Sequence, residues 1–186
     1  MSLLLLFNIP FDTYMTGGKW LDSLLGPAVV AMAIPLYNHR RIVKRFVVPI
    51  LFSVSAGCLS ALLSGYFLAK GFGLDQRLLY TLLPKSVTTP VAIELAKLTG
   101  GIPSLAALFV IVAGLIGAVF GPHFMKWCKI THYIGKGAGF GSASHAIGTS
   151  KALEIGEKEG TISLISMTLS AILTSLLIPF LSKWMH

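Results

Sequence analysis

Residues 82–101 read LLPKSVTTPVAIELAKLTGG, and this stretch places a lysine, a serine and two threonines between Pro84 and Pro90. The sequence on either side is strongly apolar. In hydrocarbon every backbone N–H and C=O group needs a hydrogen-bond partner, so irregular backbone at that depth persists only where it is buried in protein or lines a wet cavity. The stretch therefore predicts a broken helix inside a membrane, with a candidate site at the break.

The composition of the whole chain indicates an integral membrane protein. Of its 186 residues, 54% are hydrophobic and only 12% are charged, and the mean hydropathy is +0.79, whereas a soluble domain has about 25% charged residues. The net charge of +8 comes from lysines and arginines at the ends of apolar segments, a pattern typical of cytoplasmic loops and not of nucleic-acid binding. The first apolar run lacks the basic start and cleavage site of a signal peptide, so we expect the N-terminus to be retained.

Long apolar segments separated by basic or polar stretches predict an all-α, polytopic membrane fold. The expected membrane helices cover residues 21–37, 46–70, 103–120 and 161–184, with kinks at the prolines of the first and a bend of the chain at Pro122. Small residues recur at four-residue spacing in two of these helices, at Ser53, Gly57, Ala61 and Gly65 and at Ala113, Gly117 and Gly121. Such stripes let another helix approach closely. We interpret them as packing surfaces, which are also compatible with a homo-oligomer.

A second polar interruption, GAGFGSASHAIGTSKALEIG, covers residues 137–156 and resembles the first. Laying residues 84–102 over 144–162 pairs Thr89 with Thr149, Ala92 with Ala152, Glu94 with Glu154, Gly100 with Gly160 and Ile102 with Ile162, and sets Lys85 opposite His145. In both copies a polar break leads into a short helix with a glutamate, a glycine and one long apolar helix. The sequence thus predicts an internal repeat, about 74–127 and 131–184, within a single transmembrane domain over 1–186.

The basic residues distinguish two topologies for these polar segments. If both segments cross the membrane, the lysines and arginines other than Lys85 divide seven to seven between its sides. If both are re-entrant, entering and leaving on one face, nine lie on one side and five on the other. The positive-inside rule favours the re-entrant arrangement, which orients the two copies oppositely, as in the inverted-repeat core of many secondary transporters. Each segment is also long enough to span, at about 26 residues and 1.5 Å per residue, so the spanning alternative stays open.

Four long motifs resemble the LrgB/CidB family of bacterial inner-membrane proteins. They are GPAVVAMAIPLY at 26–37, PKSVTTPVAIE at 84–94, GGIPSLAALFVIVAGLIGA at 100–118 and GFGSASHAIGTSKALE at 139–154. The same family fold is found in the plastid glycolate/glycerate translocator. The resemblance covers residue 11 to the C-terminus. Family members generally carry further hydrophobic sequence before the position of Asp12, so the resemblance implies that an N-terminal part of the usual family domain is missing here.

The resemblance implies a multi-pass protein of the inner (cytoplasmic) membrane with one of two activities. The first, which we expect, is transport of small monocarboxylates such as glycolate, glycerate or pyruvate, with or without a holin-like partner of the LrgA/CidA type. The alternative is a non-transporting protein that acts with such a partner to regulate murein hydrolase activity and cell lysis. The partners expected on either reading are the lipid bilayer and the holin-like protein, with a small carboxylate anion added by the first.

A small 2-hydroxy or 2-oxo acid at the membrane midplane requires positive charge beside its carboxylate. Its second oxygen, the hydroxyl or keto oxygen, requires hydroxyl partners. The predicted substrate-binding residues are Lys85, Ser86, Thr88 and Thr89 in the first copy and Ser142, Ser144, His145 and Thr149 in the second. Lys85 is the candidate counter-ion, because an intramembrane ammonium is costly unless it pairs with an anion or faces water. Pairing with Glu94 or Glu154, or snorkelling to the surface, is the alternative role.

The remaining candidates have structural alternatives as well. The hydroxyls of the first copy lie beside the N-terminus of a helix that Pro90 helps to start, where an anion is favoured, but they are equally suited to capping that helix. His145 titrates near physiological pH and allows proton coupling, or it only packs. The residues expected to break the helices are Pro84, Pro90, Gly141 and Gly148.

Enzymatic, metal and nucleotide chemistry find no support in the sequence. Lys85 and Ser86 are adjacent and do not face each other on a helix, unlike a Ser/Lys catalytic pair. The GTSK at 148–151 does not have the order that a P-loop needs. Cys58 and Cys128 lie far apart without ligand-like spacing. We therefore expect no catalytic residue, no metal and no cofactor.

Overall fold

The computed structural model describes residues 19–20, 23–24, 27, 30–31 and 33–184, and over these residues it contains helices and no strand. Three helices are long and apolar enough to cross a membrane. They are α6 (Val47–Gly71), α9 (Pro103–Trp127) and α11 (Glu157–Trp184). Large apolar side chains such as Phe52, Phe67 and Phe120 are exposed on the outside of α6 and α9, as expected of surfaces that face lipid. The predicted all-α membrane fold is confirmed.

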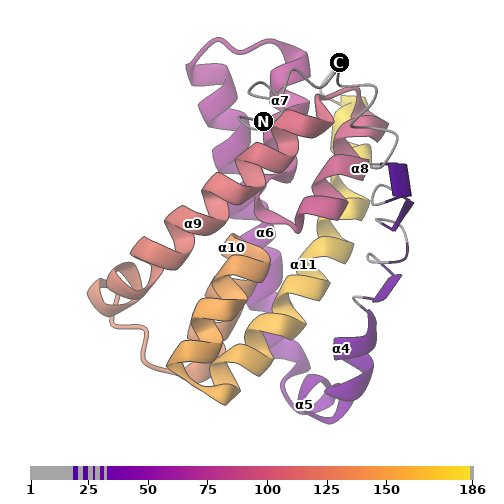
Figure 1. Cartoon of the computed structure of the whole chain (residues 1–186). Coiled ribbons are helices and arrows are strands. Elements are labelled where there is room, and N and C mark those ends of the chain that lie inside the picture. The colour runs from indigo at the N-terminus through magenta and orange to yellow at the C-terminus, as the bar shows by residue number, and fades with distance from the viewer. Residues whose placement is uncertain (1–18, 21–22, 25–26, 28–29, 32, 185–186) are drawn as a thin grey trace, which may run out of the picture.

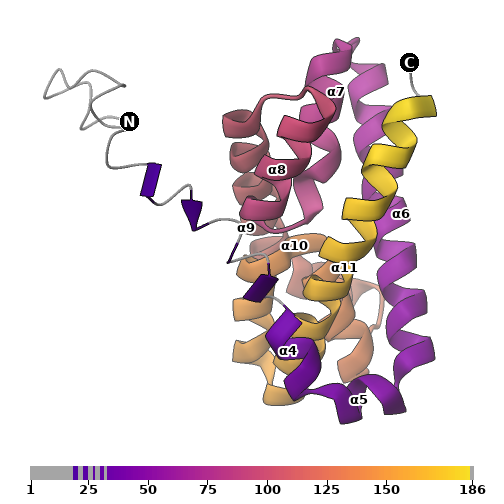
Figure 2. The ribbon, with the colours of Figure 1, turned by 90° about the vertical axis from the view of Figure 1, so that its right-hand side faces the viewer.

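The segment before α6 carries the strongest basic cluster. It forms α4 (Ala33–Asn38) and α5 (Arg40–Arg45), and Figure 2 shows both at one end of the molecule. The guanidinium of Arg40 lies 4.6 Å from the centre of the Tyr37 ring. Residues 21–22, 25–26, 28–29 and 32 of the helix predicted for 21–37 lie outside the described residues, and α4 corresponds to its last part.

The first polar segment forms a hairpin of short helices. It contains α7 (Gln76–Leu82), the 3₁₀ helix η1 (Leu83–Ser86) and α8 (Thr89–Thr99). The backbone N–H of Ile102, just before α9, donates to Thr81 Oγ1 at 2.8 Å, so the start of α9 lies beside the end of α7. Figures 1 and 2 show α7, α8 and the start of α9 at the same end as the last turn of α6. The segment therefore enters and leaves at one end of the bundle.

The second polar segment, α10 (Tyr133–Ile155), reverses direction inside its own length. The reversal falls at His145, where φ is +41° and ψ is −130°. Ser163 on α11 contacts both arms, because its carbonyl lies against Gly141 and its hydroxyl lies 2.9 Å from Thr149 Oγ1. The arms 133–144 and 146–155 thus lie together beside the beginning of α11 (Figure 1). Gly141 and Gly148, which we expected to break this helix, lie inside its arms on either side of the reversal.

Both polar segments are therefore re-entrant, and they start from opposite ends of the long helices (Figures 1 and 2). The spanning alternative is wrong for this structure. The end that holds α5 also holds the end of α9 and the start of α11, with the Lys158 ammonium 5.8 Å from the centre of the Tyr133 ring. The charge imbalance that favoured re-entry is thus present in the fold, whereas the internal repeat itself stays a prediction.

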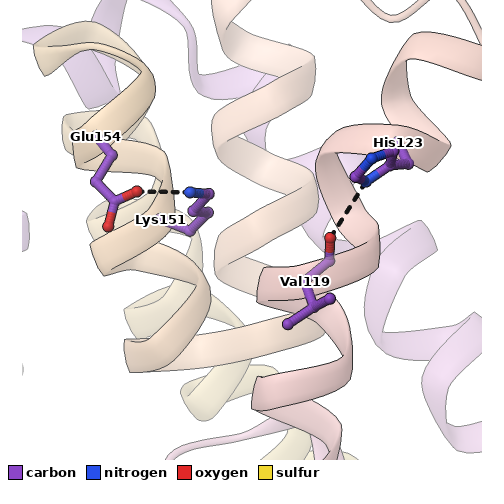
Figure 3. Close-up of polar contacts among 4 residues, drawn as sticks. All are labelled: Val119, His123, Lys151 and Glu154. Atoms are coloured by element: carbon purple, nitrogen blue, oxygen red, sulfur yellow. Dashed lines mark hydrogen bonds and ion pairs between the residues drawn. The ribbon is translucent and has the colours of Figure 1, made fainter.

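Helix α9 continues for more than a turn beyond Pro122, where we expected the chain to bend. A proline inside a helix removes one backbone hydrogen bond, and in membrane helices neighbouring side chains often support the freed groups. Figure 3 shows His123, the residue after this proline, with its Nδ1 3.4 Å from the carbonyl oxygen of Val119. The sequence rule therefore placed the end of this helix too early.

The re-entrant topology predicts the result of cysteine labelling. In a chain lacking Cys58 and Cys128, cysteines at Leu74 and Lys97 are expected to react with a membrane-impermeant maleimide from the same side, because both ends of the first hairpin lie together. A cysteine at Lys129 is expected to react from the other side. The measurement compares intact with permeabilised cells. Labelling of Leu74 and Lys97 from opposite sides would instead mean that the first polar segment spans the membrane.

Candidate functional site

The tips of the two hairpins meet in the interior of the bundle. The tip of the first hairpin is η1 with the extended residues Val87 and Thr88, and that of the second is the turn at His145. The 3₁₀ helix η1 packs against α6 and α9 and also reaches α10. Both backbone breaks thus come together between long apolar helices, as the polar breaks in the sequence indicated.

Glycines on α9 make room for the second hairpin. A β-carbon at Gly114 would lie 2.7 Å from His145 Cε1, and one at Gly121 would lie 2.8 Å from Phe140 Cε1. At Gly117 the side chain of Ser144 occupies the same space. The predicted packing role of this stripe is confirmed, and the surface that packs on it is the chain's own re-entrant hairpin.

The stripe on α6 receives both hairpins. A β-carbon at Gly57 would lie 2.6 Å from Ser142 Oγ, and one at Gly65 would lie 3.2 Å from Lys85 Nζ. These glycines are therefore covered within the chain. The stripes on α6 and α9 consequently no longer support a homo-oligomer, because the faces that suggested one are already filled.

Lys85 points along α6 and not toward an acidic side chain. Its Nζ donates to the carbonyl oxygen of Ala61 at 2.6 Å and to Ser64 Oγ at 3.2 Å. Ala61 lies near the middle of α6, so the ammonium is held near the middle of that helix and does not snorkel to an end. Among the described residues Lys85 has no carboxylate partner.

The two glutamates proposed as alternative partners of Lys85 are paired elsewhere. Glu94 binds Lys97 at 2.9 Å, and Glu154 binds Lys151 at 2.6 Å, as Figure 3 shows for the second pair. Both pairs join residues three apart on one helix and are largely exposed. The ion-pair alternative for Lys85 is therefore wrong in this structure.

The hydroxyl residues of the first tip open helix α8. Ser86 ends η1, Thr88 is the N-cap residue of α8 with φ −69° and ψ 150°, and Thr89 is its first residue. Pro84 has non-helical backbone angles, and Pro90 lies in the first turn of α8, so both prolines act where we expected a break. The first N–H groups of α8 lack helical partners and are directed toward the tip.

The hydroxyl residues of the second tip bond to the backbone of their own helical turns and, at Thr149, also to α11. Ser142 Oγ donates to the carbonyl oxygen of Ala138 at 2.7 Å, and Thr149 Oγ1 lies 2.8 Å from the carbonyl oxygen of His145. Ser144 is buried beside α9. These bonds give the second set a structural role, and the predicted contact of its hydroxyls with a substrate stays a prediction.

His145 is the residue that turns the second hairpin. It is 3% exposed, and its Nε2 lies 2.9 Å from the carbonyl oxygen of Val110 on α9. Because a carbonyl only accepts, Nε2 carries a hydrogen. Lys85 is bound to α6 and His145 to α9, so each tip is held by a different long helix.

A buried polar seam runs along the face of α11 that carries Ser166, Ser170 and Thr174. Cys58 Sγ on α6 lies 3.1 Å from Ser170 Oγ, and Thr174 Oγ1 donates to the same sulfur at 3.6 Å. Ser166 Oγ is buried without a hydrogen-bond partner in the described structure. The four-residue spacing of 166, 170 and 174 was the available signal, since polar residues repeated on one face of an apolar helix face protein and not lipid.

Substitutions at His145 separate the contribution of the backbone from that of the ring. Only glycine adopts a φ of +41° with that ψ without strain. We expect His145→Ala to lower the free energy of unfolding by about 1–3 kcal/mol more than His145→Gly does, because both lose the ring and only alanine keeps the strain. Thermal unfolding in detergent measures the difference. Equal melting temperatures would mean that the backbone at this position is not strained.

These features define a polytopic helical membrane protein with two opposed re-entrant hairpins whose polar tips meet inside the bundle. The chain belongs to the LrgB-like family, whose profile matches residues 1–184. The match thus begins at residue 1, before the position near residue 11 where the sequence motifs placed it.

Several relatives cover nearly the whole chain. The uncharacterized protein YxaC of Bacillus subtilis is 48% identical over 100% of this chain and 81% of its own length. The holin-like protein CidB of Staphylococcus aureus is 39% identical over 96% of this chain and 78% of its own length. An uncharacterized protein of Haemophilus influenzae is 39% identical over 100% of the chain and 80% of its own length. No solved structure matches the chain.

Proposed function

We propose that this protein transports small monocarboxylates of the glycolate, glycerate or pyruvate type across the inner membrane. The observation that carries the proposal is the ammonium of Lys85, held at the middle of α6 with no carboxylate partner among the described residues. A charge inside a membrane protein is costly unless an anion or water compensates it. A mobile carboxylate at the tip of the first hairpin would supply that compensation.

The surroundings of Lys85 suit the second oxygen of a 2-hydroxy or 2-oxo acid. The start of α8 presents backbone N–H groups and the positive end of the helix dipole. Ser86 and Thr89 are half-buried at the same tip and offer hydroxyl groups that donate and accept hydrogen bonds. The site thus combines one cation with hydroxyls and a helix N-terminus, without needing a metal, a cofactor or a catalytic residue.

The opposite orientation of the hairpins supports a transport cycle. In many secondary transporters broken helices meet at the midplane, and access alternates between the two sides around that point. Histidine is the side chain whose ordinary pKa lies near physiological pH, so His145 at the second tip is the candidate for proton coupling. The end with α5 carries most of the basic residues, and we assign it to the cytoplasm.

A second candidate function is favoured by the name of one set of relatives. CidB of Staphylococcus aureus is called holin-like, which suits a protein that acts with a small holin-like partner in regulating murein hydrolase activity and cell lysis. On this reading the chain would be a scaffold that moves no carboxylate. Lys85 would then matter only for holding η1 against α6.

Uptake into proteoliposomes tests the proposal directly. The purified chain is reconstituted with and without a holin-like partner, and uptake of labelled glycolate and pyruvate is measured. We expect saturable uptake of at least one acid, competed by the unlabelled acid, in at least one of the two preparations. Absence of uptake from both, with the protein shown to be inserted and folded, would favour the scaffold.

A further inference from the structure

A cavity of about 620 Å³ opens where α9 ends and α10 begins, away from the hairpin tips. Its wall contains the side chains of Lys126, Lys129, Lys136 and Lys151, and Met125 and Ile130 form part of its apolar lining. The lysines come from three places in the chain, namely the end of α9 with its following turn and the two arms of α10. An occupant of this cavity would therefore touch both α9 and the second hairpin.

The charges around the cavity are mostly uncompensated. Glu154 binds Lys151 at 2.6 Å (Figure 3), and in the described part of the chain no carboxylate pairs with Lys126, Lys129 or Lys136. Three ammonium groups thus share one concave surface. Such a basic pocket at the cytoplasmic end of membrane helices attracts an anionic headgroup.

The backbone at Lys129 adds an independent observation. Three helices end in the same way: a backbone N–H just after the helix donates to the carbonyl oxygen five residues earlier in the chain. The donor and acceptor residues are Leu74 and Ala69, Gly101 and Ala96, and Ile130 and Met125. The preceding residue is left-handed each time, and it is Gly73, Gly100 or Lys129, with φ of +64°, +83° and +55° respectively. Glycine is the residue that adopts this conformation without strain. A lysine held there indicates that its side chain has a role at the cavity.

The cavity lies at the level of the membrane surface. Trp127, the last residue of α9, is 80% exposed, and the neighbouring Phe124 ring is also exposed, with the two ring centroids 5.9 Å apart. Exposed aromatic side chains at the end of an apolar helix mark the depth of lipid headgroups. Ile155 at the cavity rim is exposed as well. The combination of basic and apolar walls at this depth fits an amphiphile better than a free anion.

We propose that this cavity binds the headgroup of an anionic phospholipid, with its phosphate among Lys126, Lys129 and Lys136 and its glycerol and upper acyl chains against Met125 and Ile130. The bound lipid joins the end of α9 to both arms of α10 and thereby fastens the second hairpin. This inference does not depend on the proposed transport function. A holin-like scaffold would use the same lipid contact.

Thermal unfolding and native mass spectrometry of the full chain in neutral detergent test this inference. Phosphatidylglycerol is expected to raise the melting temperature, whereas phosphatidylcholine and inorganic phosphate at the same concentration are not. The variant Lys126→Gln/Lys129→Gly/Lys136→Gln is expected to bind phosphatidylglycerol about a hundredfold more weakly, at roughly fivefold for each lysine. The control Arg41→Gln/Lys44→Gln/Arg45→Gln removes three charges from α5 at the same end and is expected to bind like the wild type.

The single variant Lys129→Gly separates loss of the site from loss of the fold. Without lipid it is expected to melt at or above the wild-type temperature, because glycine relieves the left-handed backbone. With phosphatidylglycerol it is expected to bind about fivefold more weakly. If the α5 control loses as much phosphatidylglycerol binding as the triple variant, the lysines act only through diffuse electrostatic attraction of the lipid. If inorganic phosphate alone raises the melting temperature, the cavity is a site for a free anion. Either result, or undiminished lipid binding by the triple variant, would overturn the proposal.

Discussion

Lys85→Ala is expected to abolish carboxylate uptake while leaving the amount of folded protein in the membrane unchanged. Removing one partner of a desolvated charge pair costs about 2–5 kcal/mol, so uptake should fall by at least about 30-fold. The fold should persist, because the carbonyl of Ala61 keeps its bond within α6 when the ammonium is removed. The measurement is proteoliposome uptake, with folded protein quantified by size-exclusion chromatography.

Lys97→Ala is the matched control for this prediction. Lys97 lies on the same re-entrant segment but is exposed and paired with Glu94, and an exposed ion pair contributes little to stability. Carboxylate uptake by Lys97→Ala should equal that of the wild type. Wild-type uptake by Lys85→Ala would contradict the transport site and leave the scaffold alternative. Gly65 is a poor choice for separating the two readings, because a β-carbon there would press on the Lys85 ammonium as well as on the packing.

Gly141→Ala is expected to cause the largest loss of stability from a single added methyl group. A β-carbon at Gly141 would meet the backbone of α11, where it contacts the carbonyl of Ser163 and lies 2.9 Å from the backbone nitrogen of Met167. Backbone atoms inside a packed pair of helices cannot move aside as a flexible side chain can. Overpacking usually costs about 1–3 kcal/mol, and we expect this variant to reach or exceed the upper value in thermal unfolding.

Gly71→Ala provides the comparison for this packing prediction. A β-carbon at Gly71, the last residue of α6, would have no atom within 4 Å apart from its chain neighbours and the backbone of its own helix. Replacing a helical glycine by alanine without a clash is neutral or stabilises by up to about 1 kcal/mol. The two variants add the same group at two helical positions, so their difference measures the contact between α10 and α11. If both variants melt alike, that contact is looser than the structure shows.

The sequence predicted those parts of the fold that depend on hydropathy and charge. The helix expected over 46–70 is α6 (Val47–Gly71), because an uninterrupted apolar run in lipid has few alternatives to a helix. The positions of the lysines and arginines selected re-entrant segments over spanning ones, since the long helices between the basic clusters fix which ends lie together. The fold class was therefore accessible without coordinates, and the charge distribution favoured the re-entrant topology without excluding the spanning one.

The details of the site were less accessible, because contacts between distant segments decide them. The stretch around His145 is rich in glycine, serine and alanine throughout, so no local preference singled out the turning residue, and Gly141 and Gly148 were the more obvious candidates. The partners of Lys85 and His145 are the backbone carbonyls of Ala61 and Val110. Backbone acceptors have no signature in the sequence, whereas carboxylate side chains do.

Because both acceptors are backbone carbonyls, the contacts of Lys85 with α6 and of His145 with α9 can break at little structural cost. Each carbonyl oxygen has two lone pairs and already accepts a bond from its own helix, so withdrawal of the ammonium or of the imidazole strands no backbone group. Detachment of Lys85 breaks its bonds to the Ala61 carbonyl and to Ser64 Oγ, and one bond to a charged donor ordinarily contributes about 1.5–3 kcal/mol. Both contacts can therefore break without unwinding α6 or α9, and under the proposed transport function a bound anion would replace the contacts of Lys85 at the first tip.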